Sequence, residues 1–193
     1  QMGLCASQCA ASSSFDNKVS PSLGKGEPPP PDLYLTEAEK KLFTVHFKDT
    51  LLAQRPDLFH KTMLSCIHAS PKMNEVIACQ QYCMRDLSKW PKLNQICQAQ
   101  ENFMLSLVYE DHLDSDAMFM RTLLLAKVHS TYLRYGFKPQ LLDIWQQQVM
   151  MQAEKTEMEE REKSEFLRVF AILNHFIVNV FYFSSTFDRS KKS

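Results

Sequence analysis

The sequence predicts an all-α fold. After Leu35, apolar residues recur three or four positions apart, which is the spacing that places them on one face of a helix. Capping residues precede several of these runs, and prolines stand where the first turn of a helix tolerates them. The 193 residues, 45% of them hydrophobic, suffice for one domain that buries a single core without disulfides or metal.

The charge balance and the cysteines restrict the class of protein. The formal net charge is zero and the pI is about 7.1, so no basic surplus recommends nucleic acid as a partner. Six cysteines occur without a signal peptide, since the N-terminal segment lacks a long apolar region and a basic start. We therefore expect a reducing, intracellular setting.

The N-terminal segment carries a lipidation pattern. Residues 2–7 read Met-Gly-Leu-Cys-Ala-Ser, which matches the pattern for N-myristoylation at Gly3 and places Cys5 as a palmitoylation candidate. One myristoyl chain gives marginal membrane binding, whereas two acyl chains anchor a protein stably. We expect the acyl chains to tether the protein to the cytoplasmic face of a membrane, in particular the plasma membrane.

The rest of the first 34 residues has the composition of a spacer. Residues 8–34 are rich in Ser, Ala, Gly and Pro and end in four consecutive prolines, Pro28 to Pro31. Such a segment cannot bury enough apolar surface to fold, and its prolines favour stiff polyproline II. We expect residues 1–34 to be a disordered acylated tail and linker, with an SH3-type ligand as the alternative use of the prolines.

The first two helices follow directly. Thr36 and Glu39 form a capping box, and Phe43, Phe47 and Leu51 follow at four-residue spacing. A second helix follows Pro56 and stops near Ser70 and Pro71. Its apolar face comprises Phe59, Met63, Cys66 and Ile67.

Two further helices occupy the middle of the chain. Trp90 and Pro91 start a long one, because proline suits the first turn, and it carries Ile96, Phe103 and Leu107. The segment 114–116 supplies N-cap residues for the next, which ends at His129. Its predicted apolar wall comprises Met120, Leu123, Leu124 and Val128.

The chain closes with two more helices. Pro139 starts one with Leu142, Trp145 and Val149 on one face, and a mixed charge run over 154–163 separates it from the last. The last run, 166–183, is apolar enough to suggest a membrane span. Polar residues interrupt it, so a buried core helix is the better interpretation. The predicted folded domain is 35–183, followed by a C-terminal tail over 184–193.

The segment around His129 resembles the proximal-histidine region of the globin family, particularly invertebrate and nematode globins. His129 closes an apolar helix, and Gly136-Phe137-Lys138-Pro139 forms the corner that follows. The Leu35-Thr36-x-x-Glu39 start and Pro71 are similar to the openings of globin helices A and C. The resemblance implies a globin fold, with helices A to H in a three-over-three sandwich around haem b, and His129 as the iron ligand.

The resemblance is weaker on the distal side of the haem. Globins place a phenylalanine over the haem six residues after the helix C proline, but this chain has Ile77 there. Counting back from His129 by the family's spacing gives Gln100 as the distal residue, whereas matching Phe103 and Met104 to the usual apolar pair gives Ala99. Gln100 could hydrogen-bond oxygen and Ala99 could not. The implied haem-binding residues are Ile77, Ala99, Gln100, Phe103, Met104 and Phe137.

Cys79 and Cys83, four residues apart before the long helix, are candidate redox thiols. Their spacing fits a redox-active thiol pair, part of a metal site, or two cysteines without a joint function. Two cysteines alone make no zinc site. A disulfide between them would shift the long helix and alter distal access, as in some neuronal globins.

The resemblance implies a haem globin that binds oxygen or related diatomic gases. A membrane tether favours redox or oxygen sensing and signalling over bulk storage, because a store should diffuse freely. The alternative is a haemless globin-fold adaptor at the membrane. A haem enzyme has little support, since no acid–base pair is placed beside the distal face. The oligomeric state is left open.

Overall fold

The computed structural model describes residues 29–80, 83, 86–87 and 90–190. Every regular element among them is helical, which confirms the all-α prediction. The α-helices are α1 (Glu37–His46), α2 (Leu58–Ala69), α3 (Pro71–Ala78), α4 (Pro91–Leu105), α5 (Ser115–Ser130), α6 (Gln140–Ala153) and α7 (Glu160–Ser190). Wider π-helical turns, η1 (Phe47–Leu52) and η2 (Ser106–Glu110), continue α1 and α4, and a 3₁₀ turn, η3 (Leu133–Tyr135), follows α5.

The helix starts lie where the sequence predicts them. Thr36 caps α1 in a complete capping box with Glu39, and Asp114 caps α5 by accepting a hydrogen bond from the Ala117 N–H. Pro71 and Pro91 occupy the first turns of α3 and α4, where the missing N–H costs nothing. Local chemistry therefore sets the boundaries of these helices.

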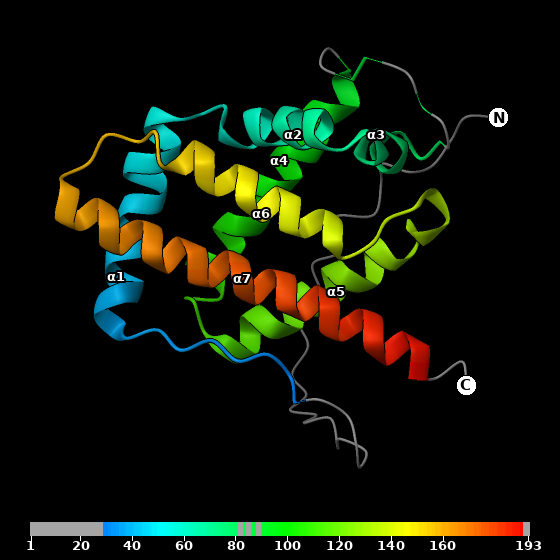
Figure 1. Cartoon of the computed structure of the whole chain (residues 1–193). Coiled ribbons are helices and arrows are strands. Elements are labelled where there is room, and N and C mark those ends of the chain that lie inside the picture. Colours follow the sequence, from blue (N-terminus) through cyan, green and yellow to red (C-terminus); the bar gives the residue numbers. More distant parts are fainter. Residues whose placement is uncertain (1–28, 81–82, 84–85, 88–89, 191–193) are drawn as a thin grey trace.

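The helices form two groups that cross each other (Figure 1). α2 contacts α6 and α6 contacts α7, so these three helices form one layer. α1 and α5 contact α7, and α4 contacts α2, so the other three long helices each touch a member of that layer. α3 contacts α2.

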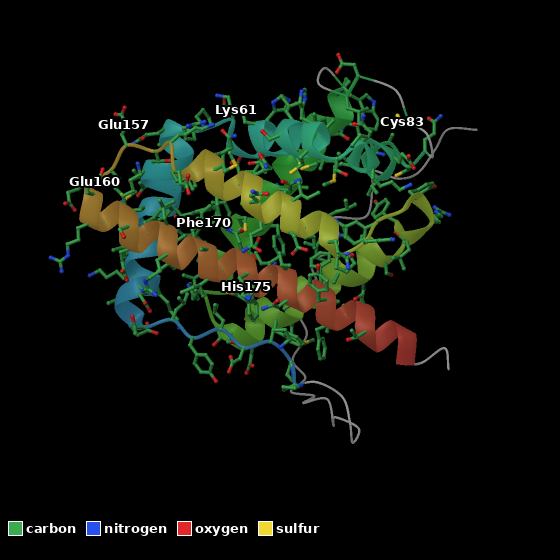
Figure 2. The ribbon with its side chains drawn as sticks, viewed as in Figure 1. Lys61, Cys83, Glu157, Glu160, Phe170 and His175 are labelled. Atoms are coloured by element: carbon green, nitrogen blue, oxygen red, sulfur yellow. The ribbon has the colours of Figure 1, made fainter. Side chains whose placement is uncertain are left out.

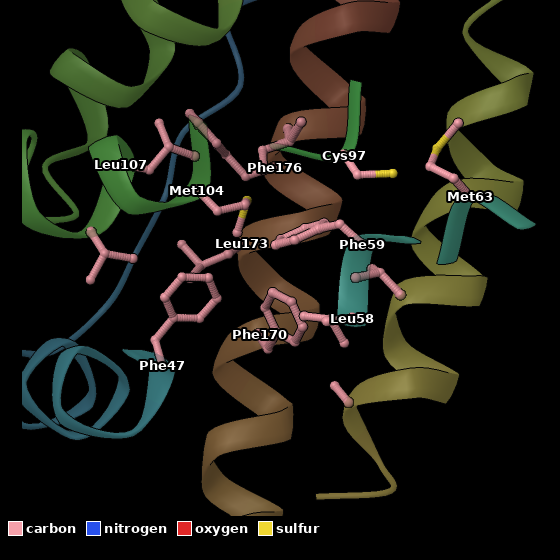
Figure 3. Packing of buried hydrophobic residues seen from close by; sticks show 14 of the residues in the cluster. Phe47, Leu58, Phe59, Met63, Cys97, Met104, Leu107, Phe170, Leu173 and Phe176 are labelled. Carbon is pink, nitrogen blue, oxygen red and sulfur yellow. The ribbon is translucent and has the colours of Figure 1, made fainter. Parts of the chain in front are cut away.

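The hydrophobic core lies between the two groups (Figure 3). Phe47 and Leu58 come from the first helices, Met104 and Leu107 from the α4 to η2 segment, and Phe170 from α7. At one end, the rings of Phe43 and Phe166 are stacked with centroids 5.0 Å apart. Removal of these aromatic rings from solvent is the main contribution to the packing of α7 against α1.

α7 is the longest helix of the described part of the chain, and there it is the one helix with the length and hydropathy to cross a membrane. In this fold 56% of that apolar window is buried. The buried side chains include Phe166, Phe170, Leu173 and Phe176, whereas His175 is exposed on the opposite side (Figure 2). The fold therefore uses α7 as a core helix.

The edges of the predicted domain differ from the structure. α7 continues to Ser190, so residues 184–190, expected in a tail, are helical. Leu33, expected in the linker, is buried with 7% exposure. Its N–H donates to Ser115 Oγ over 3.0 Å, and that hydroxyl donates to Asp32 over 2.7 Å. These long-range contacts could not be predicted from the composition of the linker.

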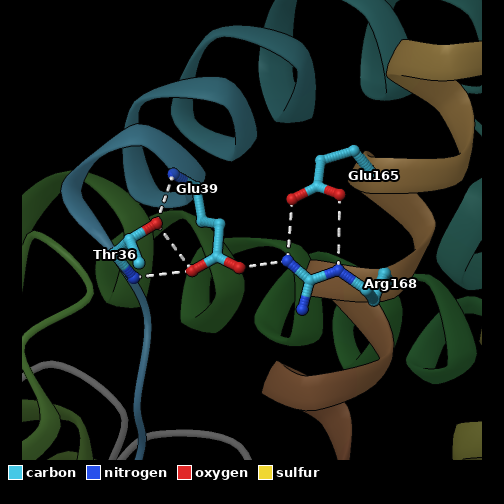
Figure 4. A network of polar contacts seen from close by, with 4 residues as sticks. All are labelled: Thr36, Glu39, Glu165 and Arg168. Carbon is cyan, nitrogen blue, oxygen red and sulfur yellow. Dashed lines mark hydrogen bonds and ion pairs between the residues drawn. The ribbon is translucent and has the colours of Figure 1, made fainter.

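A polar network joins the start of α1 to α7 (Figure 4). The Glu39 carboxylate accepts hydrogen bonds from the Thr36 N–H and hydroxyl and from the Arg168 guanidinium, which also pairs with Glu165. The Thr36 backbone N–H first, and then Arg168, lowers the pKa of Glu39 from 4.5 to about 2. The ionised carboxylate therefore stabilises the folded state.

We predict that Glu39→Gln lowers the free energy of unfolding by about 1 kcal/mol near neutral pH, the usual value of a helix cap. Because the pKa of Glu39 is lowered by folding, its contribution is complete above pH 4.5 and disappears as the pH falls toward about 2. Denaturant unfolding at several pH values measures the difference. Glu37→Gln, on an exposed carboxylate of the same helix, is the control. A cost independent of pH would contradict the assignment.

Candidate functional site

His129 lies in the last turn of α5 with one ring nitrogen fixed. Nδ1 is 2.9 Å from the carbonyl oxygen of Leu125, one turn earlier in the helix. A carbonyl oxygen only accepts, so Nδ1 carries the hydrogen and, in the neutral ring, Nε2 carries the lone pair. Within the described part of the chain, Nε2 of this partly buried residue has no hydrogen-bond partner. The geometry leaves Nε2 able to bind a metal.

Aromatic rings surround the His129 imidazole. The ring centroids of Phe137 and Phe181 are each 5.2 Å from it, and that of Tyr132 is 5.8 Å away. Burial among these rings lowers the pKa of His129 below its usual 6.5. The imidazole is therefore neutral at physiological pH, and this is the form that ligates iron.

The turn after α5 places Phe137 beside the imidazole. Gly136 has a φ of +88°, and its N–H donates to the Leu133 carbonyl over 2.9 Å. A Cβ at this position would lie 2.1 Å from Cε of Lys72 on α3. The left-handed φ favours glycine at this position, whereas the flexible end of the Lys72 side chain could move away from an added Cβ. Phe137 follows at once and is buried.

Gln100 and Ala99 lie on different sides of α4. Gln100 is partly buried, and its side-chain oxygen accepts a hydrogen bond from Nε1 of Trp145 on α6 over 3.0 Å. Ala99 is exposed. Of the two distal candidates, Gln100 is the one directed toward the layer formed by α2, α6 and α7.

The other residues predicted to contact haem are apolar and face the hydrophobic core. Met104 and Ile77 are buried with 1% and 7% exposure, and Phe103 is partly buried against the same core. No hydrogen bond or ring contact joins His129 to Gln100 among the described residues. His129 and Gln100 therefore lie on separate helices with different neighbours. α5, which carries His129, contacts α7, and α4, which carries Gln100, contacts α2.

One predicted feature of α5 is wrong. Met120, Leu124 and Val128 were expected to form an apolar wall, but they are exposed, and only Leu123 is partly buried. The buried face of α5 comprises Met118, Thr122 and Ala126. Helical spacing alone does not distinguish two apolar faces of one helix, and here the smaller, partly polar face contacts α7.

Sequence reasoning missed two residues of the site. The structure shows the Leu125 carbonyl as the partner of the imidazole, while the nearby Thr131 Oγ1 donates to the Val128 carbonyl. The four-residue spacing of Leu125 and His129 could have identified that carbonyl. Phe181 had no local signal, because it comes from α7, far away in the sequence.

None of the described cysteines is in a disulfide. Burial raises the pKa of Cys66 to about 12 and that of Cys97 to about 11, so both are protonated and unreactive. Cys79 ends α3 in a left-handed conformation, and neither it nor Cys83 is in a disulfide. Oxidation of this pair stays a prediction. The acylation candidates Gly3 and Cys5 lie outside the described residues.

Other kinds of site find little support in the part of the chain that the structure describes. No three His, Cys, Asp or Glu residues gather there as a metal site would require. Two surface hollows, one lined by Lys48, Glu101 and Leu105 and one by Leu64, His68 and Gln148, do not include His129. No protein-family model and no curated protein matches the chain.

We predict that Phe181→Ala loosens the surroundings of His129. Removing this ring leaves a cavity beside the imidazole and should lower the free energy of unfolding by about 3 kcal/mol. The pKa of His129 should rise toward 6.5, because the ring is more hydrated. Denaturant unfolding and NMR titration of the imidazole measure these effects. Leu124→Ala, on the exposed side of α5, should change neither, and an unchanged His129 pKa in Phe181→Ala would contradict the assignment.

Proposed function

We propose that this chain is a membrane-tethered haem globin that binds oxygen or a related diatomic gas and serves redox or oxygen sensing. The observation that carries the proposal is the state of His129. Its Nδ1–H is held by Leu125, its Nε2 has no partner in the described structure, and burial keeps the ring neutral.

The packing of the helices supports a globin arrangement. A three-over-three sandwich needs two layers of three helices that cross. The layer of α2, α6 and α7, with α1, α4 and α5 each contacting it, is compatible with that form. The helix after His129 is reached through the Gly136 to Pro139 corner on which the resemblance to globins rests.

The residues present are suited to haem b. The donor set needs one neutral imidazole, because the porphyrin supplies the other four nitrogen ligands, and His129 meets this need. Phe103, Met104 and Phe137 offer apolar side chains, and Gln100 offers an amide for hydrogen bonding. When bound, haem b supplies reversible binding of diatomic gases. The chain would supply the ligand nitrogen from a partly buried imidazole with aromatic neighbours.

The tether supports a role in signalling. Gly3 and Cys5 would carry two acyl chains, and two chains hold a protein at the membrane where one does not. A protein confined to a surface meets local reductants, oxidised lipids and membrane partners. It gains nothing from confinement as an oxygen store, which should diffuse freely.

A haemless helical adaptor is the second candidate, and two contacts favour it. Gln100 already bonds to Trp145, and the His129 ring already packs against Phe137 and Phe181. Side chains that satisfy one another need no cofactor to complete the core. Haem uptake separates the two candidates.

We predict that the purified chain takes up one haem per molecule, with a Soret band in the ferric, ferrous and carbon monoxide forms. His129→Ala should abolish stoichiometric uptake. His175→Ala, an exposed histidine on α7, should bind haem like the unmodified chain. Equal spectra for the two variants would reject His129 as the ligand. Absence of stoichiometric uptake by the unmodified chain would favour the adaptor.

We predict that the chain incorporates an alkyne-labelled myristate at Gly3 in cells when it is expressed with Met2 as its first residue. Gly3→Ala should abolish labelling and reduce membrane recovery, because N-myristoylation needs an N-terminal glycine. Cys5→Ser should keep the myristate but reduce membrane recovery, since one chain binds only weakly. Full membrane recovery of both variants would reject acylation as the anchor.

A further inference from the structure

The exposed side of α5 carries a row of large apolar residues. Met120, Leu124 and Val128 are spaced four residues apart and are 52%, 60% and 52% exposed, and Leu133 in η3 is 54% exposed. We name these four residues the outer face of α5. The buried face of the helix, with Met118, Thr122 and Ala126, lies on the opposite side. Adjacent exposed apolar side chains of this size mark an interaction surface.

Between Asp116, which is exposed at the start of α5, and Asp143, the charged residues of the segment that contains the outer face are all basic. From Ala117 to Leu142 there are four basic residues and no acidic one, although the whole chain has 22 of each sign. Lys127, Arg134 and Lys138 are exposed, and the Arg134 guanidinium lies over the Tyr135 ring. Arg121 pairs with Asp111 and Glu110. A neutral protein thus concentrates positive charge beside its exposed apolar row.

The N-terminal segment joins the fold beside the start of this helix. Ser115, the first residue of α5, bonds to both Asp32 and Leu33. Tyr34, 83% exposed, is next in the chain. Asp32 and Leu33 therefore lie at the end of α5 from which the outer face begins.

We propose that the outer face of α5 binds the surface of a membrane that contains anionic lipid. Apolar side chains on one helix face insert at the boundary of head groups and acyl chains, and flanking Lys and Arg attract anionic head groups. A second copy of the chain is a poorer occupant, because two such faces would bring like charges together. The inference uses neither haem nor acylation, so it stands or fails apart from the function proposed above.

The test uses the full, unacylated chain and two kinds of vesicle, phosphatidylcholine alone and phosphatidylcholine with phosphatidylserine. We expect cosedimentation with the anionic vesicles, weaker binding to the neutral ones, and weakening by salt, because the attraction is screened. The double variant Met120→Ser with Leu124→Ser should reduce the partition coefficient about tenfold or more, since two apolar side chains no longer insert.

Charge reversal tests whether the basic residues attract the anionic head groups. Lys127→Glu with Lys138→Glu should also reduce binding to anionic vesicles at least about tenfold, because each basic residue near such a surface contributes roughly fivefold. Two matched controls should bind like the unmodified chain. Val45→Ser with Met151→Ser removes exposed apolar residues from α1 and α6, and Lys41→Glu with Lys48→Glu reverses exposed charges elsewhere.

Several results would overturn the proposal. These are no binding by the unmodified chain, equal binding to the two kinds of vesicle, or equal loss in the control variants. A change of oligomeric state in Met120→Ser with Leu124→Ser, without a change in vesicle binding, would assign the face to self-association. Thermal unfolding of each variant shows that the fold is kept, which we expect because the replaced side chains are exposed.

Discussion

Burial of one face of α7 is the constraint on which the rest of the structure depends. At one end of this face, Phe166 stacks on Phe43, and at the other end Phe181 packs against His129. A buried phenylalanine contributes about 1.5–3 kcal/mol, so this face is a large part of the stability of the domain. α1, α5 and α6 are each placed by contact with it, and α2 is placed through α6. The position of the candidate site is therefore a consequence of core packing.

The properties of His129 follow from that packing in two steps. The α-helix supplies the Leu125 carbonyl one turn before the histidine, and this hydrogen bond fixes the ring and its tautomer. α7 and the Gly136 corner then place Phe181 and Phe137 against the ring, and burial lowers its pKa. Either feature alone is common in protein cores. Together they give an oriented neutral imidazole whose Nε2 has no partner in the described residues, which is the requirement for an axial iron ligand.

Much of the helical order could be predicted, because its signals are local. The Thr36 capping box, Pro91 and the Asp114 cap each mark a boundary through chemistry within a few residues. What sequence reasoning missed depends on distant contacts. It could not choose between Gln100 and Ala99, since a shift of one residue turns a helix by about 100° and only the packing of α4 shows which side faces inward. It assigned the wrong face of α5 for the same reason, and it missed Phe181 because no pattern near His129 reports a residue on α7.

The two faces of α5 would connect docking of the domain on a membrane with gas binding at a haem held by His129. One face holds His129 and contacts α7, while the other presents Met120, Leu124 and the nearby lysines to the outside. A helix with side chains is about 10 Å across, so a lipid surface against the outer face would lie within roughly that distance of the imidazole. Acyl chains alone would leave the domain free to rotate on a long linker. A docked α5 would fix which side of the domain faces the membrane, and a change at His129 would then occur in the same helix that contacts the lipid.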